Sequence, residues 1–218
     1  MGGMSEPLLV FLHGLGQTPQ FWQDQVTALP AGTRAVAPWL DGLRPGGSAD
    51  FELSRAADAV LAQLNRFGVD RMAVVGSGLG AAVAVTAAGR SPAAISQLVL
   101  SDVLPRTPKL AGAMQRMAVR AMPAGRLADA GLDRAKMVEL MKLVAGIDVR
   151  KSLSEVTART LVIGGSGNPA GVTAGRELAA GIAGARFELV GPGGAAVAAD
   201  APREFNRLLY EFLDEPAS

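Results

Sequence analysis

The chain has 218 residues, which is enough for one domain with a substantial hydrophobic core. It carries 21 Lys and Arg residues against 20 Asp and Glu residues, so no charge bias favours nucleic acid or an acidic membrane surface as a partner. It contains no cysteine and one histidine, which excludes a disulfide framework, a cysteine nucleophile and a multi-histidine metal centre within this chain. No apolar run reaches the roughly 20 residues of a membrane-spanning helix, and the first residues lack a signal-peptide pattern. We therefore expect a cytoplasmic protein without membrane insertion.

The predicted secondary structure alternates between buried strands and helices along the chain. The first strand is the apolar run PLLVFL at 7–12, which ends in the loop HGLG at 13–16. Further strands are predicted at 34–38, 72–76, 97–101, 160–164 and 186–190, and helices at 51–67, 79–90, 171–183 and 202–213. Strands buried on both faces and separated by helices predict an α/β fold with a mainly parallel central sheet flanked by helices. In such folds, ligands bind at the carboxyl ends of the strands.

One segment interrupts this alternation. Residues 104–151 show no strand pattern, but they contain helical patterns with five methionines and three prolines that break them. We predict a short helical cap here, inserted after the strand at 97–101. The chain then divides into an α/β core at 5–103 and 152–215 and a cap insertion at 104–151.

Four stretches, taken in their order and spacing, resemble the α/β-hydrolase family. The segment that supplies the oxyanion-hole loop in that family resembles LVFLHGLGQTPQFW, and its nucleophile elbow resembles VVGSGLGAAVA. The strand and loop that bear the catalytic acid resemble RTLVIGGSGNPA, and the histidine loop with the last helix resembles GPGGAAVAADAPREFNRLLYEFL. The resemblance extends over nearly the whole chain, and it implies the α/β-hydrolase fold.

The resemblance also implies which positions correspond to the catalytic triad, and each of them holds an unsuitable residue. The family elbow is G-x-S-x-G, and its alignment with Gly76-Ser77-Gly78-Leu79-Gly80 puts Gly78 at the nucleophile position. The acid position falls on Asn168 and the histidine position on Ala195. Because the only histidine of the chain is His13, no alignment can bring a histidine into the C-terminal loop. We therefore expect that this chain lacks a conventional Ser–His–Asp mechanism.

Four polar residues near the expected site remain candidates for catalysis. Ser77 stands one position before the nucleophile position, and Asp102 follows the strand at 97–101, where some members of the family place an alternative acid. His13 belongs to an HG pair that is generally structural in the family, so a structural role competes with a role as general base. Asp41, in the loop after the second strand, is a further carboxylate to consider as a base.

The anion-binding half of the family's site depends on main-chain groups, which survive any change of side chain. The resemblance places the oxyanion hole at the N–H of Leu15, after Gly14, and at the N–H of Leu79, after Gly78. The rest of the ligand pocket is predicted to be apolar. Its predicted walls are Trp39, Leu79, Val103, Val197 and some of the cap methionines.

Two functional hypotheses follow. The first is a protein with a degenerate triad that binds a hydrophobic carbonyl-type small molecule, or catalyses a non-hydrolytic cyclisation, lyase or isomerase step on it. The second is a carboxylic ester or lactone hydrolase that uses Ser77 as a relocated nucleophile, or a water molecule activated by Asp41 or Asp102. Neither hypothesis requires a cofactor or a metal ion, and we expect none. The oligomeric state is not predictable from these patterns.

Overall fold

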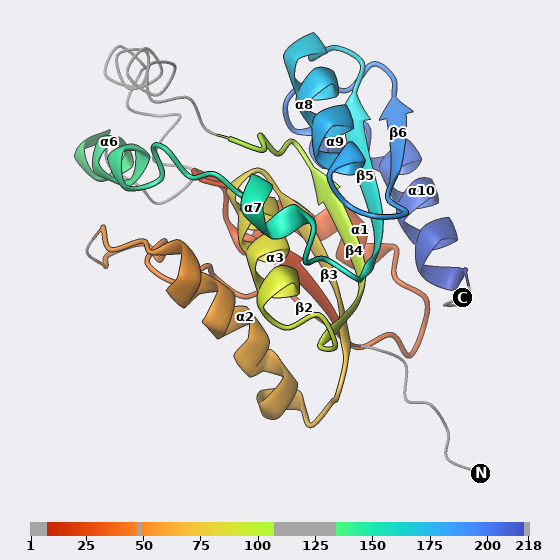
Figure 1. Cartoon of the computed structure of the whole chain (residues 1–218), viewed down its shortest axis with the longest axis horizontal. Coiled ribbons are helices and arrows are strands. Elements are labelled where there is room, and N and C mark those ends of the chain that lie inside the picture. Colours follow the sequence, from red (N-terminus) through yellow and green to blue (C-terminus); the bar gives the residue numbers. More distant parts are fainter. Residues whose placement is uncertain (1–7, 48, 107–133, 216–218) are drawn as a thin grey trace.

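A six-stranded, fully parallel sheet forms the centre of the molecule (Figure 1). The computed structural model describes residues 8–47, 49–106 and 134–215. Its strands are β1 (Leu8–Leu12), β2 (Ala35–Val36), β3 (Met72–Ser77), β4 (Ile95–Ser101), β5 (Arg159–Gly165) and β6 (Arg186–Val190), in the spatial order β2-β1-β3-β4-β5-β6. The predicted α/β fold with a parallel sheet is confirmed, and each predicted strand is present.

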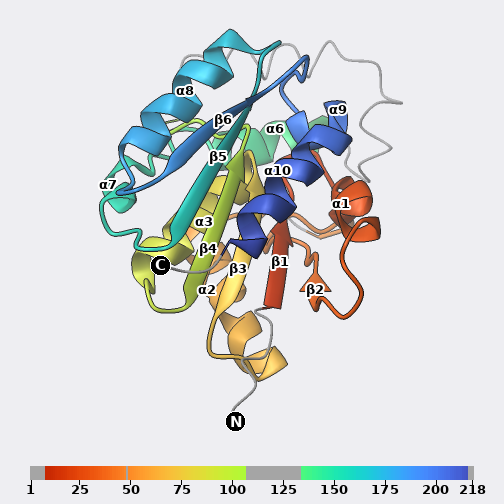
Figure 2. The same ribbon diagram turned by 90° about the vertical axis from the view of Figure 1, so that its right-hand side faces the viewer.

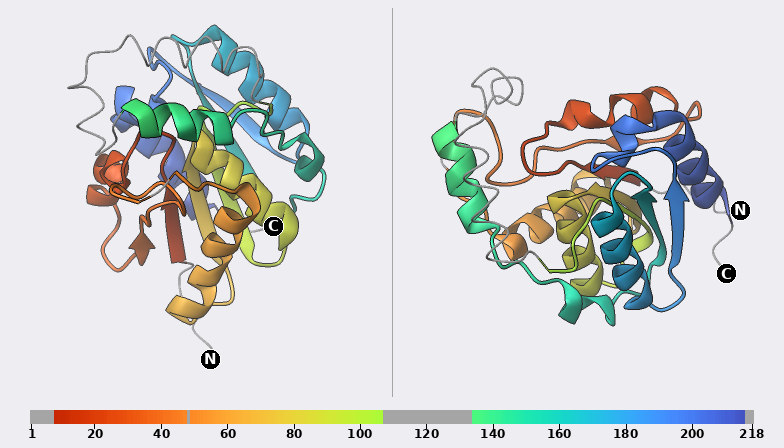
Figure 3. Two further views of the ribbon diagram at one scale, coloured as in Figure 1. Left: turned by 90° about the vertical axis from the view of Figure 1, so that its left-hand side faces the viewer. Right: turned by 90° about the horizontal axis from the view of Figure 1, so that it is seen from above.

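Helices cover both faces of the sheet. One face carries α2 (Leu53–Phe67), α3 (Leu79–Arg90) and α8 (Pro169–Ala180), and the other carries η1 (Pro19–Trp22), α1 (Gln23–Thr27), α9 (Val197–Asp200) and α10 (Pro202–Asp214). Figure 2 looks onto the face covered by α10, and the right-hand view of Figure 3 shows the sheet between the two helical layers. The four predicted helices correspond to α2, α3, α8 and α10.

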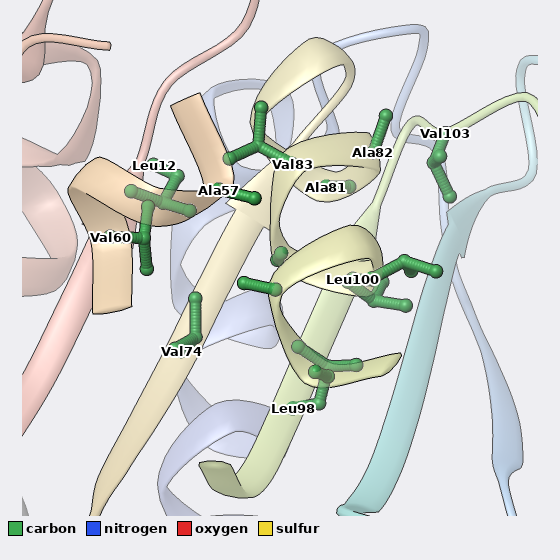
Figure 4. Close-up of a cluster of buried hydrophobic side chains, with 14 of the residues drawn as sticks. Leu12, Ala57, Val60, Val74, Ala81, Ala82, Val83, Leu98, Leu100 and Val103 are labelled. Atoms are coloured by element: carbon green, nitrogen blue, oxygen red, sulfur yellow. The ribbon is translucent and has the colours of Figure 1, made fainter. Parts of the chain in front are cut away.

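Helix α3 is the most deeply buried helix of the described chain, because small side chains let it pack closely on both sides. All residues from Gly80 to Ala88 are buried. Figure 4 shows this helix between β-strand side chains such as Val74 and Leu98 and the α2 residue Val60. This packing fixes the start of α3, and therefore the turn that precedes it, against the carboxyl end of β3.

Part of the predicted cap is described. Residues 107–133 lie outside the described residues, and the remainder forms α6 (Arg134–Leu143) and α7 (Arg150–Leu153). Helix α6 is held to the loop before α2, because the Lys136 ammonium donates to the carbonyl oxygens of Arg44 and Gly47 at 2.8 and 2.5 Å. Met137 and Leu140 of the same helix are buried in the core cluster that includes α3. The division of the chain into core and cap stays a prediction.

The first turn of α3 passes too close to β1 for any side chain at position 80. A Cβ atom on Gly80 would lie 2.6 Å from the carbonyl carbon of Leu12 and 2.7 Å from the carbonyl oxygen of His13. We expect Gly80→Ala to lower the free energy of unfolding by about 3 kcal/mol or more, since main chain must move. Urea unfolding followed by circular dichroism measures this. Gly47→Ala, where the nearest atom lies 3.5 Å away, should change stability by less than about 0.5 kcal/mol, and equal effects at both positions would contradict the close approach.

Candidate active site

The turn between β3 and α3 has the form of a nucleophile elbow with no side chain at its tip. Gly78 has φ 56° and ψ −115°, a conformation that favours glycine, and it is the residue that caps the N-terminus of α3. A Cβ atom built on Gly78 would find its nearest neighbour, the Cα atom of Gly14, 3.8 Å away. The tip therefore faces the HGLG loop, and the space between them admits a Cβ atom at ordinary contact distance.

Two main-chain N–H groups border this space. Leu79 is the first residue of α3, and Leu15 follows Gly14 in the facing loop. Among the described residues, neither N–H has a hydrogen-bond acceptor. The loop itself is held by the Gln17 side chain, whose Oε1 atom accepts from the Gly14 N–H at 2.6 Å. The Leu79 N–H is suited to an anion, because main-chain N–H groups at the start of a helix carry a partial positive charge, and the Leu15 N–H is a second donor, unpaired within the described chain, from the facing loop.

His13 is buried, and both of its ring nitrogens are engaged. Nδ1 lies 2.9 Å from the carbonyl oxygen of Gly14, and Nε2 accepts from the Leu40 N–H at 3.2 Å, which assigns the proton to Nδ1. The ring packs edge-on against Trp39 at 5.2 Å between centroids. Burial lowers the pKa of His13 below its ordinary value of 6.5, so the ring is neutral at pH 7. This geometry ties the HGLG loop to the residues after β2 and leaves no free ring nitrogen for a general base.

Asp102 is the titratable group that the fold brings to the elbow. It follows β4, next to β3 in the sheet, and its φ of 55° is the only positive φ of a non-glycine residue in the described chain. The Ser77 hydroxyl donates to its Oδ2 atom at 3.1 Å, and the Val197 N–H lies 3.3 Å from both carboxylate oxygens. Burial raises the pKa of Asp102 to about 6, an effect that these two hydrogen bonds only partly offset. No cation among the described residues pairs with it.

Ser77 does not lie at the tip of the elbow. Its side chain is 1% exposed at the end of β3, and its hydroxyl proton is directed to Asp102. The structure therefore brings two of the predicted catalytic candidates together, Ser77 and Asp102, and places the third, His13, in a separate hydrogen-bonded cluster. The hydrogen bond to a carboxylate would activate a hydroxyl, but Ser77 is buried at the end of β3 and is therefore poorly placed to reach a substrate at the tip of the elbow.

The positions that correspond to the acid and the histidine of the family lie in two loops beyond β5 and β6. Asn168 caps α8, since its Oδ1 atom accepts from the Gly171 N–H at 3.1 Å. Ala195 is exposed in the loop before α9, which the Asp200 carboxylate holds through the N–H groups on either side of it, those of Gly194 and Ala196, at 2.8 and 3.4 Å. Both acid positions lie near this loop: the Gly167 N–H, next to Asn168, donates to the Gly193 carbonyl oxygen at 2.8 Å, and the Asp102 carboxylate accepts from the N–H of Val197, the first residue of α9.

The remaining predicted residues have different surroundings. Trp39 is half-buried against His13, whereas Val103 and Val197 are buried in two separate hydrophobic clusters and do not form one wall. Asp41 is 42% exposed, and the Arg55 guanidinium binds it at 2.5 Å. Its carboxylate is thus already neutralised by a cation. Sequence reasoning missed the Val197 N–H as the partner of Asp102, and no local sequence signal indicates this contact, because 95 residues separate the two.

Two further observations limit the kinds of site. In the part of the chain that the structure describes, no three His, Cys, Asp or Glu side chains gather in a way that could hold a metal ion. None of the described helices is both long enough and apolar enough to cross a membrane.

The parallel sheet, the elbow and the facing HGLG loop are the features of the α/β-hydrolase fold, and the comparison with known families agrees. Residues 9–208 match the model of the alpha/beta hydrolase family. The chain belongs to this family, which confirms the resemblance seen in its motifs.

Individual relatives show the same relationship. Over 102 residues the chain is 37% identical to a pimeloyl-[acyl-carrier protein] methyl ester esterase of Aromatoleum aromaticum, a match that covers 47% of this chain and 39% of that protein. The chain therefore spans less than half the length of this curated relative. Among solved structures, an enol-lactonase from Burkholderia xenovorans superposes with a TM-score of 0.84 at 19% identity, over 99% of this chain and 94% of that one. A hydrolase from Pseudomonas aeruginosa gives 0.80 at 24% identity, over 99% and 92%. At these identities the two structures support the fold alone.

Proposed function

We propose that the protein hydrolyses a small hydrophobic carboxylic ester or lactone with a water molecule activated by Asp102, without a covalent acyl-enzyme. The observation that carries this proposal is the buried carboxyl of Asp102, hydrogen-bonded to Ser77 beside the elbow, with a pKa of about 6. A carboxylate with a raised pKa is a stronger base than an ordinary Asp and is still ionised at pH 7 and above. Family membership, and a relative named as a methyl ester esterase, favour hydrolysis over a non-hydrolytic role.

The reaction would use main-chain groups for charge and Asp102 for the proton. The substrate carbonyl oxygen lies against the N–H groups of Leu15 and Leu79, which bind the negative charge as it develops. The water oxygen attacks the carbonyl carbon while Asp102 takes one proton from the water. The product of this step is a tetrahedral intermediate. When this intermediate collapses, the C–O bond to the leaving group breaks and Asp102 returns the proton to the departing alkoxide. The products are a carboxylic acid and an alcohol, or one hydroxy acid from a lactone.

The absence of a side chain at Gly78 supports a route through water. In this proposal a water molecule or the acyl group takes the place of the nucleophile side chain, because position 78 carries none and a Cβ atom there would make only an ordinary contact with Gly14 at 3.8 Å. Ser77 is the weaker candidate for a nucleophile, because it is buried at the end of β3 and lies one residue before the tip of the elbow. Asp41 is the weaker candidate for a base, because its carboxylate is exposed and held in an ion pair with Arg55.

A second function competes, namely binding of a hydrophobic carbonyl compound, or a non-hydrolytic step on it, by a protein with a degenerate triad. The observation that favours it is that neither Gly78 nor Ala195 offers a reactive side chain. The same Leu15 and Leu79 amides would hold the carbonyl oxygen of the ligand in that case.

Hydrolysis assays combined with intact-mass analysis separate these functions. We expect the purified protein to hydrolyse short-chain p-nitrophenyl esters or aliphatic lactones with no initial burst, no mass increase during turnover and no adduct after treatment with a fluorophosphonate. A stoichiometric adduct on Ser77 would instead indicate the relocated nucleophile. Saturable binding of these compounds by a folded protein that turns over none of them would support the binding function.

A further inference from the structure

A buried glutamine in α1 is linked to the active-site carboxylate through α9. Gln25 is fully buried, and its Nε2 group donates to the carbonyl oxygen of Ala198 at 3.2 Å and to Oδ1 of Asn206 at 2.8 Å. Asn206 in turn donates through Nδ2 to the carbonyl oxygen of Asp24, which identifies its Oδ1 atom as an acceptor. Because both partners of Gln25 accept, the orientation of its amide is determined.

One polar atom of the Gln25 side-chain amide is left without a partner in the described chain. The Oε1 atom of Gln25 is buried and has no hydrogen-bond partner among the described residues. A buried unsatisfied carbonyl oxygen is destabilising, and an apolar side chain of the same length would avoid it. An apolar side chain would fill the same space without this unpaired atom, but it could not donate the two hydrogen bonds to Ala198 and Asn206.

The bond to Ala198 acts on the helix that contacts Asp102. Helix α9 has four residues, too few to be stable without tertiary contacts. Val197, the residue before Ala198, provides the N–H that lies 3.3 Å from both oxygens of Asp102. Gln25 thus holds α9 from one side, while Asp102 contacts its first turn from the other.

We infer that Gln25 is a positioning residue for Asp102: its amide fixes α9, and α9 presents the Val197 N–H to the carboxylate. The groups that face Asp102 are the hydroxyls of Ser77 from β3 and Ser101 from β4, the Val197 N–H from α9 and one charged group, Asp200 of α9. The first three lower the pKa of Asp102, and repulsion by Asp200 raises it. Loss of the hydrogen bond from the Val197 N–H would remove a contact that lowers the pKa of Asp102. Burial and the repulsion by Asp200, which raise this pKa, would remain. The catalytic consequence rests on the function proposed above, whereas the effect on Asp102 itself does not.

The test follows the Asp102 carboxyl directly. In protein labelled with ¹³C in its aspartate carboxyls, the Asp102 signal is assigned by its loss in Asp102→Asn and titrated from pH 4 to 8.5. We expect Gln25→Met, which keeps the length of the side chain and removes the donor, to raise the pKa of Asp102 by about one unit. The acid limb of the kcat profile should move upward by the same amount, with KM little changed.

Tyr210→Phe is the matched control, because the Tyr210 hydroxyl donates to the main-chain oxygen of the same Gln25. It removes a tie between α1 and α10 and leaves the Gln25 amide in place, so the pKa of Asp102 should stay at its wild-type value. Gln25→Asn, which withdraws the amide by one carbon, gives a second test if Gln25→Met fails to fold. If neither Gln25 variant shifts the Asp102 titration more than Tyr210→Phe does, the inference is wrong. If the titration shifts but the wild-type protein hydrolyses nothing, the positioning role stands and the proposed hydrolysis fails.

Discussion

Replacement of Asp102 by asparagine is expected to lower kcat for ester hydrolysis by at least about 100-fold at pH 8, the usual contribution of a positioned general base. Asparagine keeps the shape of the side chain and can still accept from the Val197 N–H, but it cannot take a proton from water. The loss should therefore appear in kcat, while the free energy of unfolding at pH 8 changes little or rises, because a buried charge has been removed.

The same role of Asp102 predicts how the hydrolysis rate of the wild-type protein depends on pH. A base must be ionised to act, and the pKa of Asp102 is about 6, so the wild-type rate should be constant above pH 7 and fall about tenfold for each pH unit below 6. The residual rate of the Asp102→Asn variant should not show this decrease below pH 6.

Asp41→Asn is the control for this substitution, since it makes the same chemical change at an exposed carboxylate already paired with Arg55. Its rate should remain within about twofold of wild type. Asp102→Asn protein that retained the full rate and the acid limb would show that another group activates the water, and Asp41 would then be the first residue to reconsider.

Periodicity predicted the fold of this chain well, because the forces that form its elements are local or depend on simple burial. The run LLVFL is apolar throughout and becomes β1, buried on both faces. The small residues that follow Leu79 become the buried helix α3, which approaches β1 so closely at Gly80 that no side chain fits there. The order of these elements is enough to define the parallel sheet and to place Gly78 at its carboxyl edge.

The contacts that give the candidate site its chemistry were much less predictable. Asp102 and Val197 are 95 residues apart, and Gln25 and Ala198 are 173 apart. Each contact forms because the fold brings two distant segments together, and neither residue type indicates in the sequence which residue it will contact. The raised pKa of Asp102 has the same origin, since burial depends on what the rest of the chain packs around the carboxyl.

The structure also bears on which residue would serve as the acid of a restored triad. Alignment with the family places that position at Asn168, but this side chain caps α8. Asp102 instead contacts the segment that follows Ala195, through the Val197 N–H. A histidine introduced at position 195 would therefore have a carboxylate next to its own loop without any change at position 168.

The double variant Gly78→Ser, Ala195→His is accordingly expected to gain serine-hydrolase activity with Asp102 as its acid. We expect a rate on p-nitrophenyl esters about 10³-fold above wild type, an initial burst and a fluorophosphonate adduct at position 78. The elbow has room for the new side chain, although φ of 56° makes a non-glycine residue there cost about 1–2 kcal/mol of stability. Circular dichroism and the melting temperature would establish that the variant folds.

Two triple variants decide which acid operates in this restored triad. Adding Asp102→Asn should remove most of the gain, by about 10³-fold, because the introduced imidazole loses the carboxylate that orients it and stabilises its charge. Adding Asn168→Asp should change the rate by less than about threefold, since that side chain continues to cap α8. If activity appeared only with Asn168→Asp, the acid would belong after β5, and Asp102 would have to be regarded as a residue that holds α9 in place. This experiment therefore identifies the acid of the restored triad, while Asp102→Asn in the natural protein tests the base of the water route.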